Sequence, residues 1–119
     1  MVDRVEGRDG RDTLRVAVEE MGRACYRLDA RGAAAVERAR DDLEQAVGHL
    51  GSVAFDHRLP PSVRQRAQRC REALSAHLVA TQALDAAGVS PTKVAGMLHR
   101  GAEMGAAEVT ACVNSVTQV

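Results

Sequence analysis

The sequence predicts an all-α fold, specifically an antiparallel four-helix bundle, on three observations. Alanine is abundant, and the chain holds one Tyr, one Phe and no Trp, a composition typical of helices packed closely through small side chains. Apolar residues recur three and four positions apart over most of the chain. Clusters of glycine and proline interrupt this pattern at a few points only. These breaks place the helices at about residues 13–29, 33–51, 61–87 and 91–118.

The chain before the first helix has little to bury. Residues 1–12 alternate charges and include two glycines, so we expect a flexible N-terminal arm followed by a single helical domain over residues 13–119. Asp12 or Thr13 can cap the first helix. Its apolar stripe is Leu14, Ala17, Val18, Met21, Ala24, Cys25 and Leu28.

Residues 29–32 decide whether the first two helices are separate. Gly32 can adopt a backbone angle that other residues avoid, which favours a short turn between two antiparallel helices. No proline interrupts this stretch, so the alternative is three helices with the first two fused. A fused helix of about 40 residues would span roughly 60 Å and extend beyond its partners.

The connection to the third helix runs to Pro60 and Pro61, which are suited to the start of a helix. Phe55 and Leu59 lie just before it, and we expect both to cover one end of the core.

The last two helices form the clearest predicted unit, a hairpin that turns at Gly88. Gly88 can end one helix in the left-handed conformation. Ser90 can cap the next helix, and Pro91 suits its first position. Folding the chain about residue 89 places His77 next to Gly101 and Cys70 near Glu108. We expect these two helices to be the longest.

Charge and cysteine content narrow the possible functions. The 16 basic and 16 acidic residues balance, so no net charge directs the chain to nucleic acid or to a membrane. Residues 1–56 nevertheless carry a net charge of −3, and residues 57–119 carry +3. No apolar run approaches the roughly 18 residues of a membrane span. Three cysteines without a Cys-x-x-Cys pair predict reduced, core-packed thiols in the cytoplasm; convergence of these thiols with His77 on a soft metal is the alternative.

A strip of small residues in the fourth helix needs an explanation, because glycine costs a helix interior about 1 kcal/mol. The strip contains Gly101, Ala102 and Gly105. Two alternatives stand: close packing within the chain, with space for a bulky neighbour such as His77, or contact with a protein partner. The ends of the long hairpin that extend beyond the other helices are a second candidate for partner contact.

A dense basic run near the start of the third helix is a further candidate, since guanidinium groups bind carboxylates and phosphates in a bidentate manner. We select Arg64 and Arg71 from it as partner-binding residues. The alternative is a charge ladder between helices, in which the run Arg58, Arg64, Arg66, Arg69 and Arg71 pairs with Glu37, Asp41, Asp42 and Glu44 on the preceding helix.

The turn at Gly88, between the last two predicted helices, supports an alternative function. Residues 87–90, followed by Val94, Met97 and Leu98, resemble the turn and recognition-helix start of helix-turn-helix DNA-binding domains. The resemblance covers about sixteen residues and implies that Thr92, Lys93 and Arg100 contact DNA. The chain departs from the family at Leu84, where a small residue is usual, and both flanking helices are longer than those of the motif.

The sequence contains no phosphate-binding loop, no catalytic pairing of nucleophile and base, and none of the Glu-x-x-His pairs of di-iron bundles. We therefore predict no enzymatic activity, no cofactor and no metal. The favoured function is a small cytoplasmic helical module that acts through protein–protein contact as a homodimer. DNA binding through residues 84–100 is the alternative.

Overall fold

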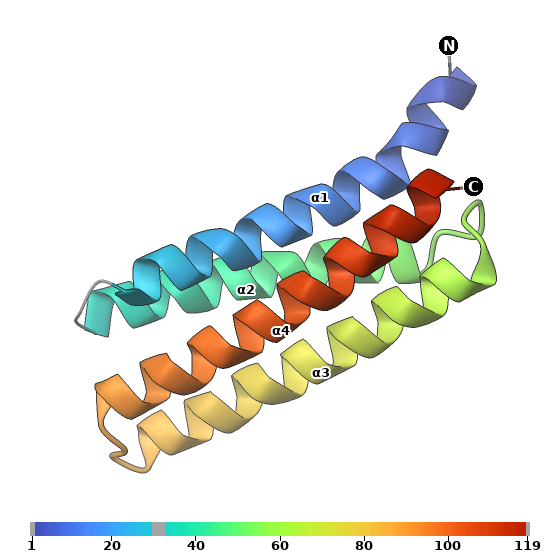
Figure 1. Cartoon of the computed structure of the whole chain (residues 1–119). Helices are drawn as coiled ribbons and strands as arrows, with labels where there is room; N and C mark the ends of the chain where they lie inside the picture. Colours follow the sequence, from blue (N-terminus) through green and yellow to red (C-terminus); the bar gives the residue numbers. More distant parts are fainter. Residues whose placement is uncertain (1, 30–32, 119) are drawn as a thin grey trace.

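The computed structural model describes residues 2–29 and 33–118, and these residues form four helices and no strand (Figure 1). The helices are α1 (Val2–Asp29), α2 (Ala33–Ala54), α3 (Pro61–Ala86) and α4 (Pro91–Gln118). The predicted four-helix fold is confirmed, and α1 and α2 are separate helices. The turn predicted at Gly32 lies outside the described residues.

The helices pack as a square in chain order. Each helix lies against the next, α4 also packs against α1, and α2 approaches α4 across the diagonal. The bundle is elongated, measuring 49 × 21 × 20 Å. Apolar residues of all four helices form one core, with Leu14, Met21, Leu43, Leu50 and Leu98 among its fully buried members.

The first helix begins much earlier than expected. It starts at Val2 rather than near residue 13, so its length of 28 residues equals that of α4. The prediction that the last two helices are the longest is therefore wrong, and α1 is the helix that extends past the others in Figure 1. One reason is Gly10, which is buried against the side chain of Leu59. The flexibility of residues 1–12 remains a prediction.

The turn between α3 and α4 has the chemistry that the sequence predicts. Gly88 has φ of 88°, the left-handed conformation. The Val89 N–H donates to the Leu84 carbonyl, and the Gly88 N–H donates to the Asp85 carbonyl, which together form a Schellman motif. The Ser90 hydroxyl accepts the Lys93 N–H at 3.4 Å, so Ser90 caps α4.

The connection between α2 and α3 behaves only partly as predicted. Leu59 is buried and closes one end of the core, but the Phe55 side chain is 66% exposed. Phe55 instead lies beneath Arg71, whose guanidinium carbon is 5.6 Å from the ring centroid. Asp56 accepts hydrogen bonds from the backbone N–H and the guanidinium of Arg58, which fixes the turn. The guanidinium of Arg58 lowers the pKa of the Asp56 carboxyl.

The predicted approach of His77 to Gly101 sets how closely α3 and α4 pack. A Cβ atom added at Gly101 would lie 2.4 Å from Cδ2 of the His77 ring, which is closer than packed atoms tolerate. The ring Nε2 is hydrogen-bonded to the Met97 carbonyl. The Thr81 hydroxyl donates to the backbone carbonyl of His77, one turn earlier.

Replacing Gly101 with alanine separates two contributions to the free energy of unfolding, namely the packing of His77 and the helix propensity of the residue. Gly101→Ala should lower the free energy of unfolding by about 1–3 kcal/mol, because the new methyl group displaces a hydrogen-bonded ring. Gly96→Ala is the matched control: no atom lies within 4 Å of its added Cβ, and it should stabilise the fold by about 1 kcal/mol. Urea unfolding of both variants checks the prediction. Equal stabilisation by the two substitutions would contradict the contact.

Candidate functional site

The outward side of α3 is not covered by any other helix within the described residues. Within residues 2–29 and 33–118, α3 packs against α2 and α4 and does not reach α1. A surface helix normally turns charged residues toward solvent. Over the second half of α3 the exposed residues are instead mostly apolar, namely Ala73, Ala76, Val79, Ala80 and Ala83, and Val79 is 66% exposed. We call these five residues the outer face of α3.

A groove of about 520 Å³ follows the α4 side of this face. Met104 stands at its edge with 74% of its surface exposed. Leu74 and His77 contribute from α3, and the Cys70 thiol lies 3.8 Å from the Gly105 carbonyl. The groove therefore combines apolar and small residues with the charged Arg69 and Glu108 at its lining. It lies beside an exposed, flexible methionine, a side chain common at adaptable contact surfaces.

The predicted small-residue strip lies beneath this groove and packs within the chain. Gly101 meets His77, and a Cβ atom at Gly105 would lie 2.7 Å from the Met21 sulfur. Ala102 is fully buried in the core. Packing within the chain, the first of the two alternatives for this strip, accounts for all three residues. Gly101 and Gly105 also line the groove, so the groove is where these two residues reach the surface of the protein.

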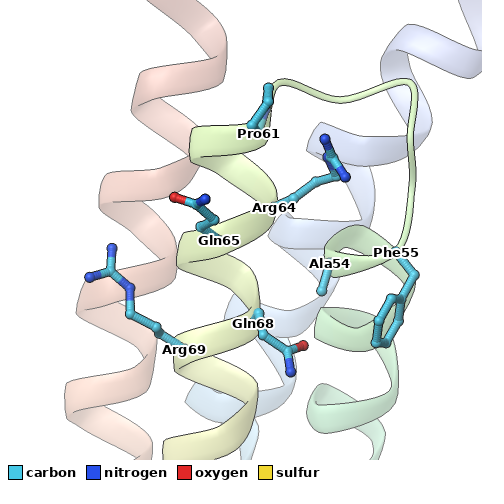
Figure 2. Close-up of a pocket in the computed structure, with 7 residues that line it drawn as sticks. All are labelled: Ala54, Phe55, Pro61, Arg64, Gln65, Gln68 and Arg69. Atoms are coloured by element: carbon cyan, nitrogen blue, oxygen red, sulfur yellow. The ribbon is translucent and has the colours of Figure 1, made fainter.

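A second pocket, of about 470 Å³, lies on the α2 side of α3 (Figure 2). Figure 2 shows Arg64 and Gln68 on the side of α3 that faces Ala54 and Phe55, whereas Arg69 points toward α4. Arg64 Nε donates to the Leu59 carbonyl at 3.2 Å. Arg71 Nε donates to Gln68 Oε1 at 3.0 Å and its guanidinium lies over Phe55. These contacts hold Arg64 and Arg71 in place, and neither forms an ion pair with an acid among the described residues.

The alternative of a charge ladder between α2 and α3 fails at Asp42, the one buried acid among the four proposed. Asp42 lies on the opposite side of α2, where its carboxylate accepts Arg27 Nε at 2.7 Å and lies 3.7 Å from Arg23 Nε. Both of these arginines belong to α1. Glu37, Asp41 and Glu44 are exposed on α2. The buried ion pair therefore joins α1 to α2.

The residues predicted for DNA binding are exposed at the start of α4: Thr92, Lys93 and Arg100. Their helix, however, lies antiparallel beside α3 along its length (Figure 1). In a helix-turn-helix domain the two helices cross at about 90–120°. The hairpin thus has the turn chemistry of that motif without its geometry.

A contact between the buried Glu20 and the partly exposed His49 is a polar feature that was not predicted from the sequence. Glu20 is 2% exposed, and His49 Nδ1 lies 2.8 Å from its Oε1 across the α1–α2 contact. Glu20 is three residues after Ala17 and four before Ala24, both in the buried stripe of α1. That spacing was a signal that its carboxylate points inward. The pair lies away from both grooves beside α3.

The cysteines behave as core residues. Cys70 and Cys112 are buried, Cys25 is partly buried, and all three are free thiols. Burial raises the pKa of the Cys70 thiol to about 11. Burial also raises the pKa of the Cys25 thiol. It raises the pKa of the Cys112 thiol as well, although the nearby positive charge of Arg66 acts in the opposite direction. Across residues 2–29 and 33–118, no group of three or more His, Cys, Asp or Glu side chains is placed to hold a metal ion.

Comparisons with known proteins add no family or relative. No family model, curated protein or solved structure matches the chain. None of the helices in the described part of the chain is both long enough and apolar enough to span a membrane. The interpretation of the site therefore rests on the surfaces beside α3.

Raised thiol pKa values predict low reactivity in the folded protein, since the thiolate is the reacting species. With a chromogenic disulfide reagent at pH 8, Cys25 should react first and Cys70 slowest. Reactivity should rise with pH, because each thiol ionises as the pH approaches its raised pKa. In guanidinium chloride all three should react rapidly. Rapid reaction of Cys70 in the folded protein at pH 8 would show that its burial is wrong.

Removing one partner of the Glu20–His49 pair should leave a buried carboxyl group without its hydrogen bond. His49→Leu should therefore lower the free energy of unfolding by about 1–3 kcal/mol. His57, which is exposed, provides the control, and His57→Leu should change stability by less than about 0.5 kcal/mol. Adding Glu20→Leu to His49→Leu should recover much of the loss. Chemical denaturation measures all three variants, and a neutral His49→Leu would contradict the pairing.

Proposed function

We propose that this chain is a non-enzymatic protein–protein contact module of the cytoplasm and that it acts as a homodimer. The observation that carries the proposal is the uncovered, apolar outer face of α3, with Val79 66% exposed. Exposed apolar patches bordered by polar residues mark interaction sites more often than they mark ordinary surface.

The surroundings of this face support the same proposal. Met104 adds an exposed apolar side chain on the α4 side of this face, and Phe55 is exposed beside Arg71 on the α2 side of α3. Exposed methionine and aromatic side chains are enriched where proteins meet. The buried thiols of Cys70 and Cys112 suit a reducing compartment, which supports the cytoplasmic location.

Sedimentation equilibrium across the micromolar range tests the proposal. The expected mass is twice the 12.7 kDa of one chain. Val79→Ser should weaken the dimer about tenfold or more, because each copy loses a buried apolar side chain at the contact. Tyr26 is 80% exposed on α1, so Tyr26→Ser should leave the dimer unchanged. A strict monomer at every concentration would overturn the homodimer.

A further inference from the structure

The surface shared by α2 and α3 carries opposite charges at its two ends. The basic end, beside the α2–α3 connection, contains Arg64 and Arg71 with the pocket of Figure 2. The acidic end contains Glu37, Asp41 and Glu44, all exposed on the first half of α2, and these three acids outnumber the partly buried cation beside them, Arg40. We call this surface the α2–α3 face.

Two contacts fix how the charges lie along the bundle. Arg40 Nη1 is 3.4 Å from both the Leu78 carbonyl and the Thr81 hydroxyl, so Arg40 is level with the second half of α3. A Cβ atom at Gly51 would lie 3.4 Å from Arg71 Cδ, so Arg71 is level with Gly51. The acids between residues 37 and 44 are therefore level with residues near Val79 on α3. Arg71 and Arg64 lie farther along the bundle, toward the α2–α3 connection.

This register keeps the opposite charges of one chain apart. Ten residues separate Asp41 from Gly51, a distance of about 15 Å along a helix. A salt bridge between Asp41 and Arg71 within the chain would need their charged atoms within about 4 Å. Arg71 is moreover held by Phe55 and Gln68, on the side away from the acids. The basic and acidic ends thus both remain available to another molecule.

The middle of the face is hollowed and combines charged, polar and apolar side chains. A shallow hollow of about 590 Å³ lies there on α3, lined by Arg71, Glu72, Ser75, Ala76, Val79 and Ala80. Small side chains at Ser75 and Ala76 let a second helix approach closely. Val79 supplies the exposed apolar contact.

We infer that a second copy of this chain docks antiparallel on the α2–α3 face, about a two-fold axis that passes near Ser75. In that arrangement Arg71 faces the partner's Asp41, and Arg64 faces the partner's Glu37. The same two pairs recur on the other side of the axis, as a two-fold interface requires. This inference rests on the proposed homodimer and names its contact surface.

Charge and area both favour a second copy as the occupant. The face is self-complementary, whereas a nucleic acid would be attracted at the basic end and repelled at the acidic end. Helix α3 has 26 residues and is roughly 39 Å long, and two packed helices are about 20 Å wide. The face therefore offers on the order of 800 Å², the area that a standard interface buries on each partner.

Paired charge reversals test the arrangement. The acid-end variant carries Glu37→Lys and Asp41→Lys, and the basic-end variant carries Arg64→Glu and Arg71→Glu. Each variant alone presents like charges to its own copy, so its dimer dissociation constant should rise about tenfold or more. In an equimolar mixture, positions 37, 41, 64 and 71 are basic on one variant and acidic on the other, so the paired positions again carry opposite charges. The mixture should form a heterodimer, measured by sedimentation velocity and by native mass spectrometry.

The controls keep the outcomes distinct. Arg15→Glu with Glu19→Lys reverses two exposed charges on α1 and should leave the dimer unchanged. Circular dichroism reports whether each variant remains helical. If the basic-end variant unfolds because Arg64 loses its bond to Leu59, Arg71→Glu mixed with Asp41→Lys replaces it under the same criterion.

Three results would overturn the inference, and they differ in what else they affect. If both charge variants dimerise as the unmodified chain does, the dimer uses another surface, and the proposed function stands. If both variants are folded monomers that fail to combine when mixed, the face takes part in the dimer but the antiparallel pairing is wrong, and the proposed function stands. If the unmodified chain is itself a monomer, the inference and the homodimer fail together.

Discussion

The contact between His77 and the backbone at Gly101 is the constraint on which the arrangement of this bundle depends. The ring occupies the space where any other residue at 101 would place its side chain, and the Met97 carbonyl holds it there. This contact sets the register of α3 against α4. It brings Cys70 to Gly105 and leaves Met104 outside the core. Because α3 packs against α4 on one side and against α2 on another, the side of α3 that points away from the bundle remains exposed.

The distribution of charge follows from the same packing. The buried acid of α2, Asp42, pairs with arginines of α1, which satisfies the requirement that a buried charge be paired. The exposed acids of α2 lie on the opposite side of that helix, and the register of α2 against α3 separates them from Arg64 and Arg71. A chain with no net charge thus presents two separate charged ends on one face.

Local chemistry explains which features the sequence could predict. Gly88, Ser90 and Pro91 act on their immediate backbone, so the turn between α3 and α4 could be predicted residue by residue. The approach of His77 to Gly101 followed from folding two regular helices about that turn. The candidate surface could be predicted only in part. Arg64 and Arg71 could be selected because they belong to a dense basic run. Their predicted acidic partners in α2, however, depended on the register of α2 against α3, which the sequence pattern does not determine.

Other features depend on contacts between distant segments, which the sequence pattern does not report. Gly10 was interpreted as a sign of flexible chain, yet it packs against Leu59, more than forty residues away. Phe55 was expected to cover one end of the core with Leu59, but it is exposed and contacts Arg71 at the surface. Val79 and the alanines near it belong to the second half of α3, where apolar residues lie on nearly every side of the helix. Which side remains exposed is decided only when α1 packs against α4 rather than against α3.

The most direct test of the account is a dilution series followed by backbone amide NMR. If a second copy covers the α2–α3 face, concentration-dependent shifts should cluster at residues 37–44 and 64–80, and amides of α1 should not move. Shifts concentrated on α1, or spectra that do not change with concentration, would contradict the account.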